Sequence, residues 1–540
     1  MESQNQNRLL IAIALSLLVL IMFQRFFAAP QQNRITTVSS PTETATTKLT
    51  TVLPEQIPER EKTDENIVFM ENRVFKIALT DDGARAKQIW LKTYENAKTN
   101  KPTEILDSKI TEEIFTGPLL TQDLFLESTV PQRWTLIDSK NDYVKYQFEN
   151  SAGIVVTKEL FFHNSNYGIG LRLTITNNNN IATPVKYKIV GGSALLAQAG
   201  MDQRYVGADV KIDQDIKRLN SRNKLLKGGG NIFYGSPSWA SARGRYFSIA
   251  LEPLQEEEAS FIEKEGEKSI RTGIIIGPIT MAAGSTINKE FLLYAGPNDT
   301  DEIKRTSTNM DEVVTFGFFG GISTILLSVL KFLHKIFGNY GVSIIILTML
   351  ANLLLFPLTR KSLTSMKEMQ AIQPETEALR KEHKNNPQKL NKEIMELYKK
   401  HKINPLGGCL PMFFQMPIFI ALFQLLIRSV ELKGANFLWI KDLSEPDAAF
   451  RLPRVVPFVG EYINILPILI VIAMFLQQKI TQPKTGQTDQ QKMMAIMLPL
   501  IIVIFCYNLP SGCLLYWLTS TSIMVILQEF AIKKTVPRVT

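Results

Sequence analysis

Cysteine and histidine are scarce in this chain, which has three Cys and four His among 540 residues. The cysteines, Cys409, Cys506 and Cys513, lie in or beside apolar stretches. The polar region before them therefore has no disulfide framework and needs a hydrophobic core. No Cys or His recurs at the spacing of a metal site, and the polar region lacks a nucleophile elbow and a phosphate-binding loop. We therefore expect no metal, no cofactor and no enzymatic activity.

Two acidic clusters, Asp81-Asp82 and Glu256-Glu257-Glu258, are the remaining candidates for acid–base chemistry. Such clusters are far more often turns or solvated faces than catalytic groups. We interpret both in that way.

Long apolar runs are missing from the first half of the chain and abundant in the second. Residues from about Thr63 to Asp311 are polar and charged, whereas Val313 to Ile532 contain repeated uncharged stretches of 15 to 19 residues. Stretches of that length suit a bilayer core of roughly 30 Å. One hydrophobic core rarely grows beyond about 250–300 residues. The chain is therefore predicted to be a polytopic membrane protein that carries a large soluble domain.

The N-terminus begins with an apolar run, Leu9 to Phe23, behind Arg8. We predict a transmembrane anchor at residues 1–28, and a cleaved signal peptide is the alternative. Phe27 stands where a cleavage site favours a small residue, which favours the anchor. Residues 29–63 are rich in Thr, Ser, Pro and Gln and are predicted to form a flexible linker.

Residues 64–312 have the pattern of a β-sandwich. Short alternating runs such as Val74–Leu79, Tyr143–Phe148 and Leu171–Thr176 are bounded by Asp, Asn or Gly. Alternation of this kind predicts strands with one buried face. Many short strands without long intervening helices indicate an all-β sandwich domain.

Residues 313–338 are apolar but have two faces. Leu326, Leu330 and Leu333 recur on one face at helical spacing, whereas Lys331 and Lys335 recur on another. We predict an amphipathic helix that lies in the membrane interface, with the leucines toward lipid and the lysines toward water.

Five further membrane spans are predicted within residues 339–531, and a basic tail follows at 532–540. The spans are placed at about 341–358, 409–427, 462–476, 493–507 and 513–527. With the anchor, six spans put both termini and every basic loop in the cytoplasm and the β domain outside, as the positive-inside rule requires. A seventh span at 313–330 would put the basic loops on the wrong side.

The largest basic loop, residues 360–405, has eleven Lys/Arg between Thr359 and Pro405 against six Glu. Helical spacing on both sides of Asn385-Asn386-Pro387 predicts a helical hairpin, with a kink or fresh start at Pro374. The hairpin is either a solvated connector or a docking surface for ribosomal RNA or lipid headgroups, without specificity for a nucleic-acid sequence. Its candidate docking residues are Arg360, Lys361, Lys367, Arg380, Lys381, Lys399 and Lys400.

Two amides lie inside the predicted spans. Asn352 is eight residues from Arg360, roughly 12 Å along a helix, and Gln415 is roughly 9 Å from its own cytoplasmic end. A polar side chain without a partner is costly in hydrocarbon. These residues therefore form either an interhelical hydrogen bond or the wall of a hydrated cavity open to the cytoplasm. The last three apolar runs are only about 15 residues long, so they thin the bilayer unless Gln477, Gln478 or Gln528 extend them.

The sequence resembles the YidC family of membrane protein insertases. The residues that carry the resemblance are Phe356-Pro357-Leu358-Thr359, Asn404-Pro405-Leu406-Gly407-Gly408-Cys409, Gln415-Met416-Pro417-Ile418-Phe419 and Leu509-Pro510-Ser511-Gly512. Their order and spacing match the family, and the basic hairpin lies between the first two. The large β domain is similar to the periplasmic domain of Gram-negative members, which implies a location in the bacterial inner membrane.

The resemblance implies a hydrophilic groove open to the cytoplasm and to lipid, and closed outside. The groove residues it implies are Thr348, Asn352, Gln415, Tyr516 and Trp517. The apolar helix of a client would slide past Phe419, Met474 and Phe505. The implied partners are nascent membrane proteins and the Sec translocon, with the ribosome at the hairpin and tail. A transporter and a sensor receptor with an external β domain are the competing classes.

The chain departs from its family at one groove position. Many members place Arg or Lys five residues before the proline of Phe-Pro-Leu-Thr, where this chain has Asn352. The resemblance thus leaves open whether a fixed charge or only hydration is required there.

Overall fold

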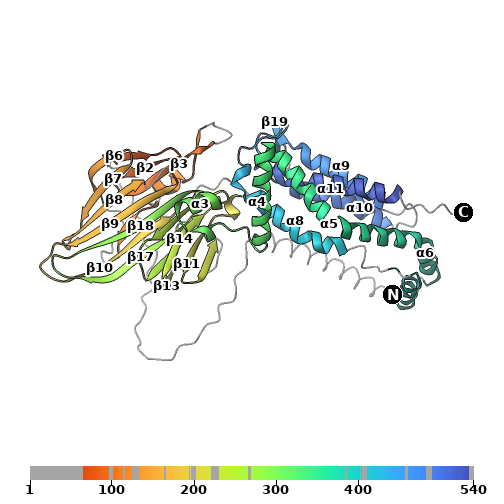
Figure 1. Ribbon diagram of the computed structural model, residues 1–540, viewed down its shortest axis with the longest axis horizontal. Coiled ribbons are helices and arrows are strands. Elements are labelled where there is room, and N and C mark those ends of the chain that lie inside the picture. The colour runs from red at the N-terminus through yellow and green to blue at the C-terminus, as the bar shows by residue number, and fades with distance from the viewer. Residues whose placement is uncertain are drawn as a thin grey trace, which may run out of the picture. The chain divides into compact units, whose positions relative to one another are not determined.

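The chain folds into two compact units, a β unit and a helical unit, which divide at Val313 (Figure 1). The computed structural model describes residues 65–95, 101–113, 116–124, 133–162, 166–193, 195, 202–220, 230–265, 269–383, 386–401, 403, 410–456, 460–481 and 489–533. The predicted anchor at 1–28 and linker at 29–63 lie outside these residues, as does most of the predicted tail. Each unit is described by itself.

The described residues of the β unit form three sheets. The largest has nine strands in the order β12 (Asp215–Asn220), β11 (Gly207–Ile212), β14 (Pro237–Arg243), β15 (Phe247–Pro253), β18 (Thr286–Pro297), β9 (Gly168–Asn177), β8 (Ile154–Phe162), β7 (Tyr143–Glu149) and β6 (Thr135–Lys140). The second has five, in the order β13 (Gly230–Tyr234), β16 (Ala259–Glu265), β17 (Ser269–Met281), β10 (Thr183–Gly192) and β5 (Thr121–Asp123). The third has four, β1 (Ile67–Glu71), β2 (Phe75–Thr80), β3 (Arg85–Glu95) and β4 (Pro102–Glu104).

Two of these sheets face each other. Strands β10 and β17 of the five-stranded sheet lie against β14 and β15 of the nine-stranded sheet. Side chains along β8 alternate between buried and half-buried positions, as expected for a strand with one face in a core. Two short helices, α2 (Ser108–Glu113) and α3 (Thr300–Thr306), complete the unit. The prediction of a β-sandwich is confirmed.

One core position of the β unit is occupied by a lysine. Lys158 on β8 is fully buried, and its Nζ donates to the carbonyl oxygens of Leu119 at 2.7 Å and Ala84 at 2.9 Å. Both acceptors have left-handed backbones, with φ of 71° and 44°. Burial lowers the pKa of Lys158 well below its ordinary value. Because its partners are backbone carbonyls of two turns, we interpret Lys158 as a structural tie.

The two acidic clusters are held in ion pairs. Asp81 lies 3.2 Å from Arg133, and Asp82 lies 3.7 Å from Arg85 across one turn. Glu257 lies 2.9 Å from Lys289. All three carboxylates are buried. The interpretation as a turn holds for the two aspartates. The interpretation as a solvated face is wrong for Glu257.

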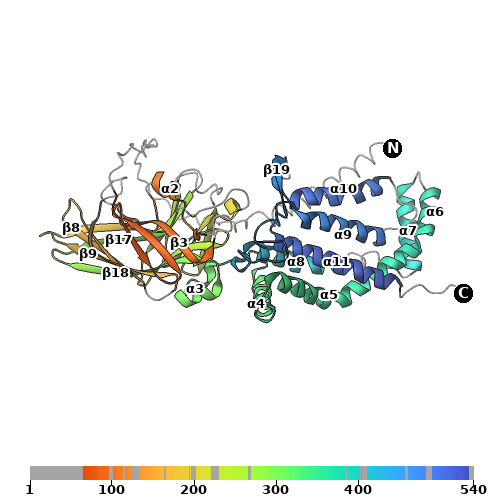
Figure 2. The same ribbon diagram turned by 90° about the horizontal axis from the view of Figure 1, so that it is seen from above.

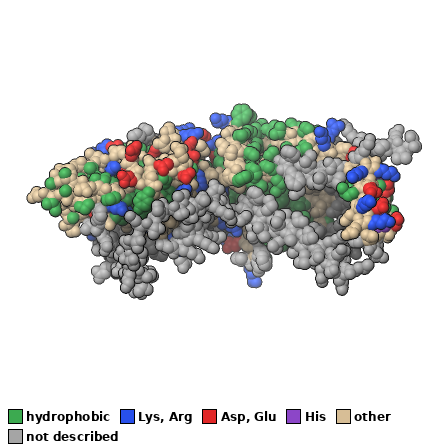
Figure 3. All heavy atoms as spheres, turned by 90° about the horizontal axis from the view of Figure 1, so that it is seen from below, with side chains coloured by type: hydrophobic (Ala, Val, Ile, Leu, Met, Phe, Trp, Pro, Cys, Tyr) green, Lys and Arg blue, Asp and Glu red, His purple; other side chains and the backbone are tan. Residues whose placement is uncertain are grey.

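The helical unit is built from eight helices among its described residues (Figure 2). They are α4 (Gly320–Phe337), α5 (Tyr340–Ala371), α6 (Gln373–Glu382), α7 (Pro387–Lys400), α8 (Leu410–Arg428), α9 (Ile465–Thr481), α10 (Asp489–Cys506) and α11 (Ser511–Lys533). Helix α11 packs against α9 and α5, α4 packs against α5 and α8, and α10 packs against α9. Hydrophobic side chains gather on this unit, and charged ones gather at its α6–α7 end (Figure 3).

Three described helices are long and apolar enough to cross a membrane, namely Gly320–Phe337, Tyr340–Met369 and Ser511–Glu529. Shorter apolar helices span Gln415–Arg428, Ile465–Ile480 and Ala495–Cys506. Helix α9 continues through Gln477 and Gln478, and α11 continues through Gln528. The amide residues therefore extend these short apolar runs. With the runs extended in this way, local thinning of the bilayer is not expected.

Helix α5 has different bounds from the prediction. A single helix of 32 residues runs from the predicted span into the first arm of the hairpin, with Pro357 inside it. The fresh start expected at Pro374 occurs beside it, where α6 begins at Gln373.

The predicted orientation of residues 313–338 is wrong in part. Leu330 and Leu333 are buried within the helical unit, and Ile325, Phe332 and Ile336 face outward instead. Lys331 is also not free in water, because its Nζ lies 3.1 Å from Glu431. The prediction of the two faces rests on apolar spacing. Such spacing cannot distinguish a face that packs against protein from a face that contacts lipid.

Candidate functional site

Polar side chains follow one face of α5 where it meets α11. Thr348 is buried and its hydroxyl donates to Ile344 O at 2.6 Å, within the helix. One turn later, the amide of Asn352 donates to Thr348 O at 2.8 Å and to Ser520 Oγ on α11 at 3.4 Å. Thr359 and Ser362 continue the same face toward the hairpin and are also buried. We call Thr348, Asn352, Thr359, Ser362 and Ser520 the polar stripe.

The interhelical hydrogen bond that the sequence left as one alternative for Asn352 is thus present. The side chain of Asn352 is nevertheless only half-buried. It therefore has surface left for water or a client in addition to its contact with Ser520.

Aromatic rings join α8 to α11 beside the stripe. The ring of Phe419 on α8 lies 5.7 Å from that of Tyr516 and 6.0 Å from that of Trp517, the latter edge to face. Tyr516 is buried and Trp517 is half-buried. Separations of this size are typical of favourable aromatic pairs. The structure therefore brings one predicted slide residue together with two predicted groove residues.

The other predicted residues differ in how exposed they are. Gln415 is half-buried on α8, one turn before Phe419, and Met474 is half-buried on α9. Phe505 on α10 is 74% exposed. Exposure of a large apolar ring on an apolar helix fits contact with lipid or with another helix.

At the opposite end from the hairpin, the Leu509-Pro510-Ser511-Gly512 motif is tied to the loop between α8 and α9. The hydroxyl of Ser511 donates to Glu445 O at 2.8 Å, and its backbone N–H donates to the same oxygen at 2.8 Å. The N–H of Gly512 donates to Leu443 O at 2.8 Å. A Cβ on Gly512 would lie 3.1 Å from that oxygen, so only glycine fits without movement.

A second set of hydrogen bonds joins α9 to α10 at the same end. Asp447 accepts from the first backbone N–H groups of α9, Ile465 at 2.7 Å and Leu466 at 3.1 Å. The amide of Asn464 donates to Tyr507 O at 2.8 Å, just beyond the last residue of α10. Asp447, Asn464 and Tyr507 are all buried. A network of buried hydrogen bonds therefore joins α9, the end of α10 and the start of α11 to the loop after α8.

The basic hairpin has its own small core. Ile372, Leu397 and Ile403 are buried together, and Met369, Leu379 and Tyr398 pack against them. Asn386 caps α7 by accepting from Lys389 N at 3.1 Å. A core of this kind gives the hairpin a defined structure, which argues against a merely solvated connector.

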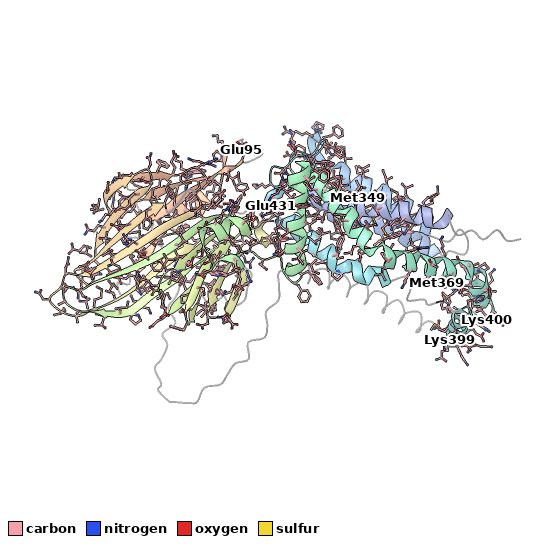
Figure 4. All side chains as sticks on the ribbon, viewed as in Figure 1. Glu95, Met349, Met369, Lys399, Lys400 and Glu431 are labelled. Atoms are coloured by element: carbon pink, nitrogen blue, oxygen red, sulfur yellow. The ribbon has the colours of Figure 1, made fainter. Side chains whose placement is uncertain are left out.

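The charged side chains of the hairpin point away from that core. Lys399 and Lys400 lie at the end of α7 (Figure 4). The other five candidate docking residues differ in exposure. Arg360, Lys361, Arg380 and Lys381 are exposed, and Lys367 is half-buried. Among the residues that the structure describes, no group of His, Cys, Asp or Glu is suited to hold a metal.

Several residues of the site were missed from the sequence. Ser520 stands in a run of four hydroxyl residues, Thr519 to Ser522, and hydroxyls usually bond within their own helix, so the sequence does not identify Ser520 as the partner of Asn352. Asn464 precedes an apolar helix, which is a capping signal. The residue that actually caps α9, Asp447, lies 18 residues away in sequence from Ile465 and leaves no local pattern.

Comparison with known proteins gives matches along nearly the whole chain. Residues 68–329 match the family described as YidC periplasmic domain, and residues 332–538 match the family described as 60Kd inner membrane protein. The membrane protein insertase YidC of Pelobacter propionicus is 31% identical over 550 residues, which cover 98% of this chain and 99% of that protein. The corresponding protein of Citrifermentans bemidjiense is 35% identical over 400 residues, 73% of this chain and 70% of its own.

A solved structure of an active YidC insertase is 16% identical and covers 87% of this chain and 93% of its own, with a TM-score of 0.37. The relatives are membrane protein insertases and not enzymes, and their clients are membrane proteins. The β unit corresponds to their periplasmic domain, and the helices to their inner-membrane part. The chain belongs to the YidC family of membrane protein insertases.

Proposed function

We propose that the polar stripe, together with Gln415, forms a water-accessible path along which the polar tail of a client enters the membrane from the cytoplasm. The observation that carries the proposal is the run of polar residues on one face of α5, which begins beside the basic hairpin and reaches Asn352, whose amide bonds Ser520 of α11. The path stops before the network at Ser511 and Gly512.

The physical effect of such a path is solvation, and no bond is made or broken. A charged or polar tail pays a large free-energy cost in hydrocarbon. A hydrated stripe that reaches partway across shortens the apolar distance that the tail must cross. The closed outer end keeps the membrane sealed while the path is open inside.

The apolar helix of the client then leaves sideways past α8 and α10. Phe419 is placed at the edge of the stripe by its contacts with Tyr516 and Trp517. Phe505 supports this route because its ring is exposed on an apolar helix. Met474 on α9 is the third slide residue, and its unbranched side chain adapts to varied apolar partners.

The topology that fits this path has six spans, with residues 1–28 as the first and with both termini in the cytoplasm. The hairpin then lies in the cytoplasm, where its exposed basic residues can dock the ribosome, helped by the tail. The Sec translocon is the second partner, for clients with large domains to translocate. Support for both comes from the charge of these segments and from family resemblance.

Site-specific photocrosslinking tests the route. A photoreactive amino acid at Phe419 or Phe505 should crosslink to a stalled nascent membrane protein. Ile336, which is 58% exposed on α4, serves as a control on an apolar surface away from the route. A crosslink from Ile336 without one from Phe419 and Phe505 would refute the route. Solute accumulation in sealed vesicles would instead favour a transporter.

A further inference from the structure

The loop between α8 and α9 exposes apolar and basic side chains together. Leu438 is 75% exposed and Phe450 is 62% exposed, and Arg451 and Arg454 are exposed beside them. Large exposed apolar side chains are uncommon in clusters on water-facing surfaces. We call Leu438, Trp439, Phe450, Arg451, Arg454 and Tyr462 the outer-rim surface.

One part of this surface is a tight turn that presents two apolar residues. Phe437 and Ile440 exchange two backbone hydrogen bonds of 2.9 Å, which leaves Leu438 and Trp439 at the tip. Leu438 has a φ of 52°, a left-handed conformation that leucine rarely adopts. The indole N–H of Trp439 donates to Asp447 at 3.2 Å. The polar edge of this ring is therefore satisfied while its apolar body stays 41% exposed.

The other part is a hairpin formed by β19 (Phe450–Val456) and β20 (Gly460–Ile463). These strands form a sheet of their own, with Phe450 opposite Ile463 and Arg451 opposite Tyr462. An isolated two-stranded hairpin is at best marginally stable in water. We therefore expect another surface to cover its exposed Phe450 and Tyr462 side chains.

The position of the hairpin in the chain places it at the membrane surface. It ends at Ile463 and α9 begins at Ile465, one residue beyond Asn464. At the start of the loop, Arg428 donates to Thr315 O at 2.8 Å, so the loop shares its end of the unit with the residues that follow the β unit. Because the β unit is the periplasmic domain, this end is the periplasmic one.

The exposed charges of the loop are mainly basic. Lys441, Arg451 and Arg454 are exposed, and Glu461 is the one exposed carboxylate among the described residues of 433–463. Aromatic side chains favour the headgroup layer. Basic side chains beside them are attracted to anionic lipids, and arginine can bind a phosphate through two hydrogen bonds.

We propose that the outer-rim surface binds the headgroup layer of the periplasmic leaflet, with Leu438, Trp439, Phe450 and Tyr462 inserted and the two arginines on lipid phosphates. The surface thereby fixes the depth of α9 and anchors the closed end of the helical unit. The inference depends only on the location of the chain in the membrane, and not on the route of the client.

Nitroxide accessibility in the full-length protein tests the depth of insertion. The three native cysteines are replaced by Ser, and single labels are placed at Leu438→Cys or Phe450→Cys in lipid nanodiscs. Tyr234→Cys, at a position 76% exposed on β13, provides the value in water, and Ile496→Cys, at a position 55% exposed near the middle of α10, provides the value in hydrocarbon. We expect collision rates with oxygen and with a neutral nickel chelate that lie between those of the two controls.

Rates equal to those of Tyr234→Cys would overturn the proposal, because the surface would then lie in water. Low rates with both reagents would also overturn it, because they indicate cover by another protein or by a second copy. If the cysteine-free form does not fold, Phe450→Trp and Tyr234→Trp are compared in the native-cysteine chain. Quenching by brominated lipid should then increase for Phe450→Trp only, and an equal increase for both would count against insertion.

The role of the arginines is tested by changing their charge. Arg451→Glu with Arg454→Glu is compared with Lys217→Glu plus Lys264→Glu, which makes the same change on exposed residues of the β unit. Adding phosphatidylglycerol to phosphatidylcholine nanodiscs should lower nickel access at Phe450→Cys. Each basic side chain near an anionic surface strengthens attraction about fivefold, so the arginine variant should lose this response and the lysine variant should keep it. A response that survives in the arginine variant would refute binding through these residues.

Discussion

Lys331 on α4 and Glu431 in the loop after α8 form an ion pair of 3.1 Å in which the Glu431 side chain is only 8% exposed. Glu431 also accepts from Ser429 Oγ at 2.6 Å. The pair therefore fixes one face of α4 against the rest of the helical unit. Because a carboxylate buried without its partner is costly, this contact specifies how α4 is turned.

A labelling experiment follows from this contact. Lys331→Cys should react slowly with an impermeant thiol reagent added to spheroplasts, because Lys331 faces protein. Lys335→Cys, one turn along on an exposed position, should react several times faster. Fast reaction at both from outside would show that position 331 faces water, and it would contradict the packing of this face of α4 against Glu431. Reaction of Lys335→Cys only from the cytoplasm would instead indicate a spanning α4 and contradict the predicted topology.

Residues 301–313, shortly before α4, belong to the β unit, and this changes how a deletion should be made. Ile303 and Met310 are fully buried, and Ser307 and Asn309 contact Glu252. Deleting 70–300 would strip the cover from these residues, whereas deleting 65–313 removes them with their partners. We expect the second form to accumulate to higher levels and to retain most insertion of a small client.

The hairpin should be indispensable by comparison. Deleting Lys361 to Asn404 removes the basic surface and the core formed by Ile372 and Leu397, so insertion should be lost. The measurement for both deletions is rescue of a depletion strain, with protein levels checked by immunoblot. Rescue by the hairpin deletion, without rescue by the stable β-unit deletion, would reverse the assignment.

Much of the fold could be predicted from the sequence because its signals are local. Alternation along segments such as β8 reveals a strand, and the charge of the hairpin reveals an end of the membrane part. The bounds of α9 and α11 were less accessible. Gln477, Gln478 and Gln528 are polar, so an apolar-run criterion stops before them although the backbone continues as helix.

The contacts of the site were harder to predict because they join residues far apart in the chain. Asn352 and Ser520 are 168 positions apart, and Lys331 and Glu431 lie on elements whose adjacency only packing defines. A polar residue in an apolar run signals that a partner exists, but it does not say which residue is the partner. The Leu-Pro-Ser-Gly motif likewise carries the resemblance to the family without revealing its contacts at Leu443 and Glu445.

Closure of the periplasmic end should depend on Gly512. In Gly512→Val, the added Cβ meets Leu443 O at 3.1 Å and Leu432 Cδ1 at 3.2 Å, so the loop must move. Ser511→Ala removes a buried hydroxyl donor, but Glu445 O keeps its bond from the Ser511 N–H, so a loss of only about 0.5–1.5 kcal/mol is expected, the net value of a hydrogen bond. The measurement is thermal unfolding in detergent together with proton leak of proteoliposomes. Gly512→Ala is the milder control, and an unchanged leak in Gly512→Val would contradict the role in closure.

Hydration, and not a fixed charge, is the property that we expect Asn352 to supply. A basic residue there would attract an acidic client tail with a Coulomb energy of about 4 kcal/mol at 4 Å for an effective dielectric of about 20. The hydrogen bonds of Asn352 are worth only about 0.5–1.5 kcal/mol net each. Asn352→Leu should therefore impair insertion severely, whereas Asn352→Arg should be tolerated and improve clients with acidic tails.

Ser520→Ala separates hydration from helix packing. This variant removes the 3.4 Å contact between α5 and α11 but leaves the amide of Asn352 in place, so insertion should remain near normal. The measurement for all three variants is protease accessibility of a translocated tail with zero, one or two Asp. If Ser520→Ala fails as badly as Asn352→Leu, the interhelical bond is what matters. Normal translocation by Asn352→Leu would refute the hydration argument, and success of Asn352→Arg alone would mean that the charge found in many family members is needed in this chain too.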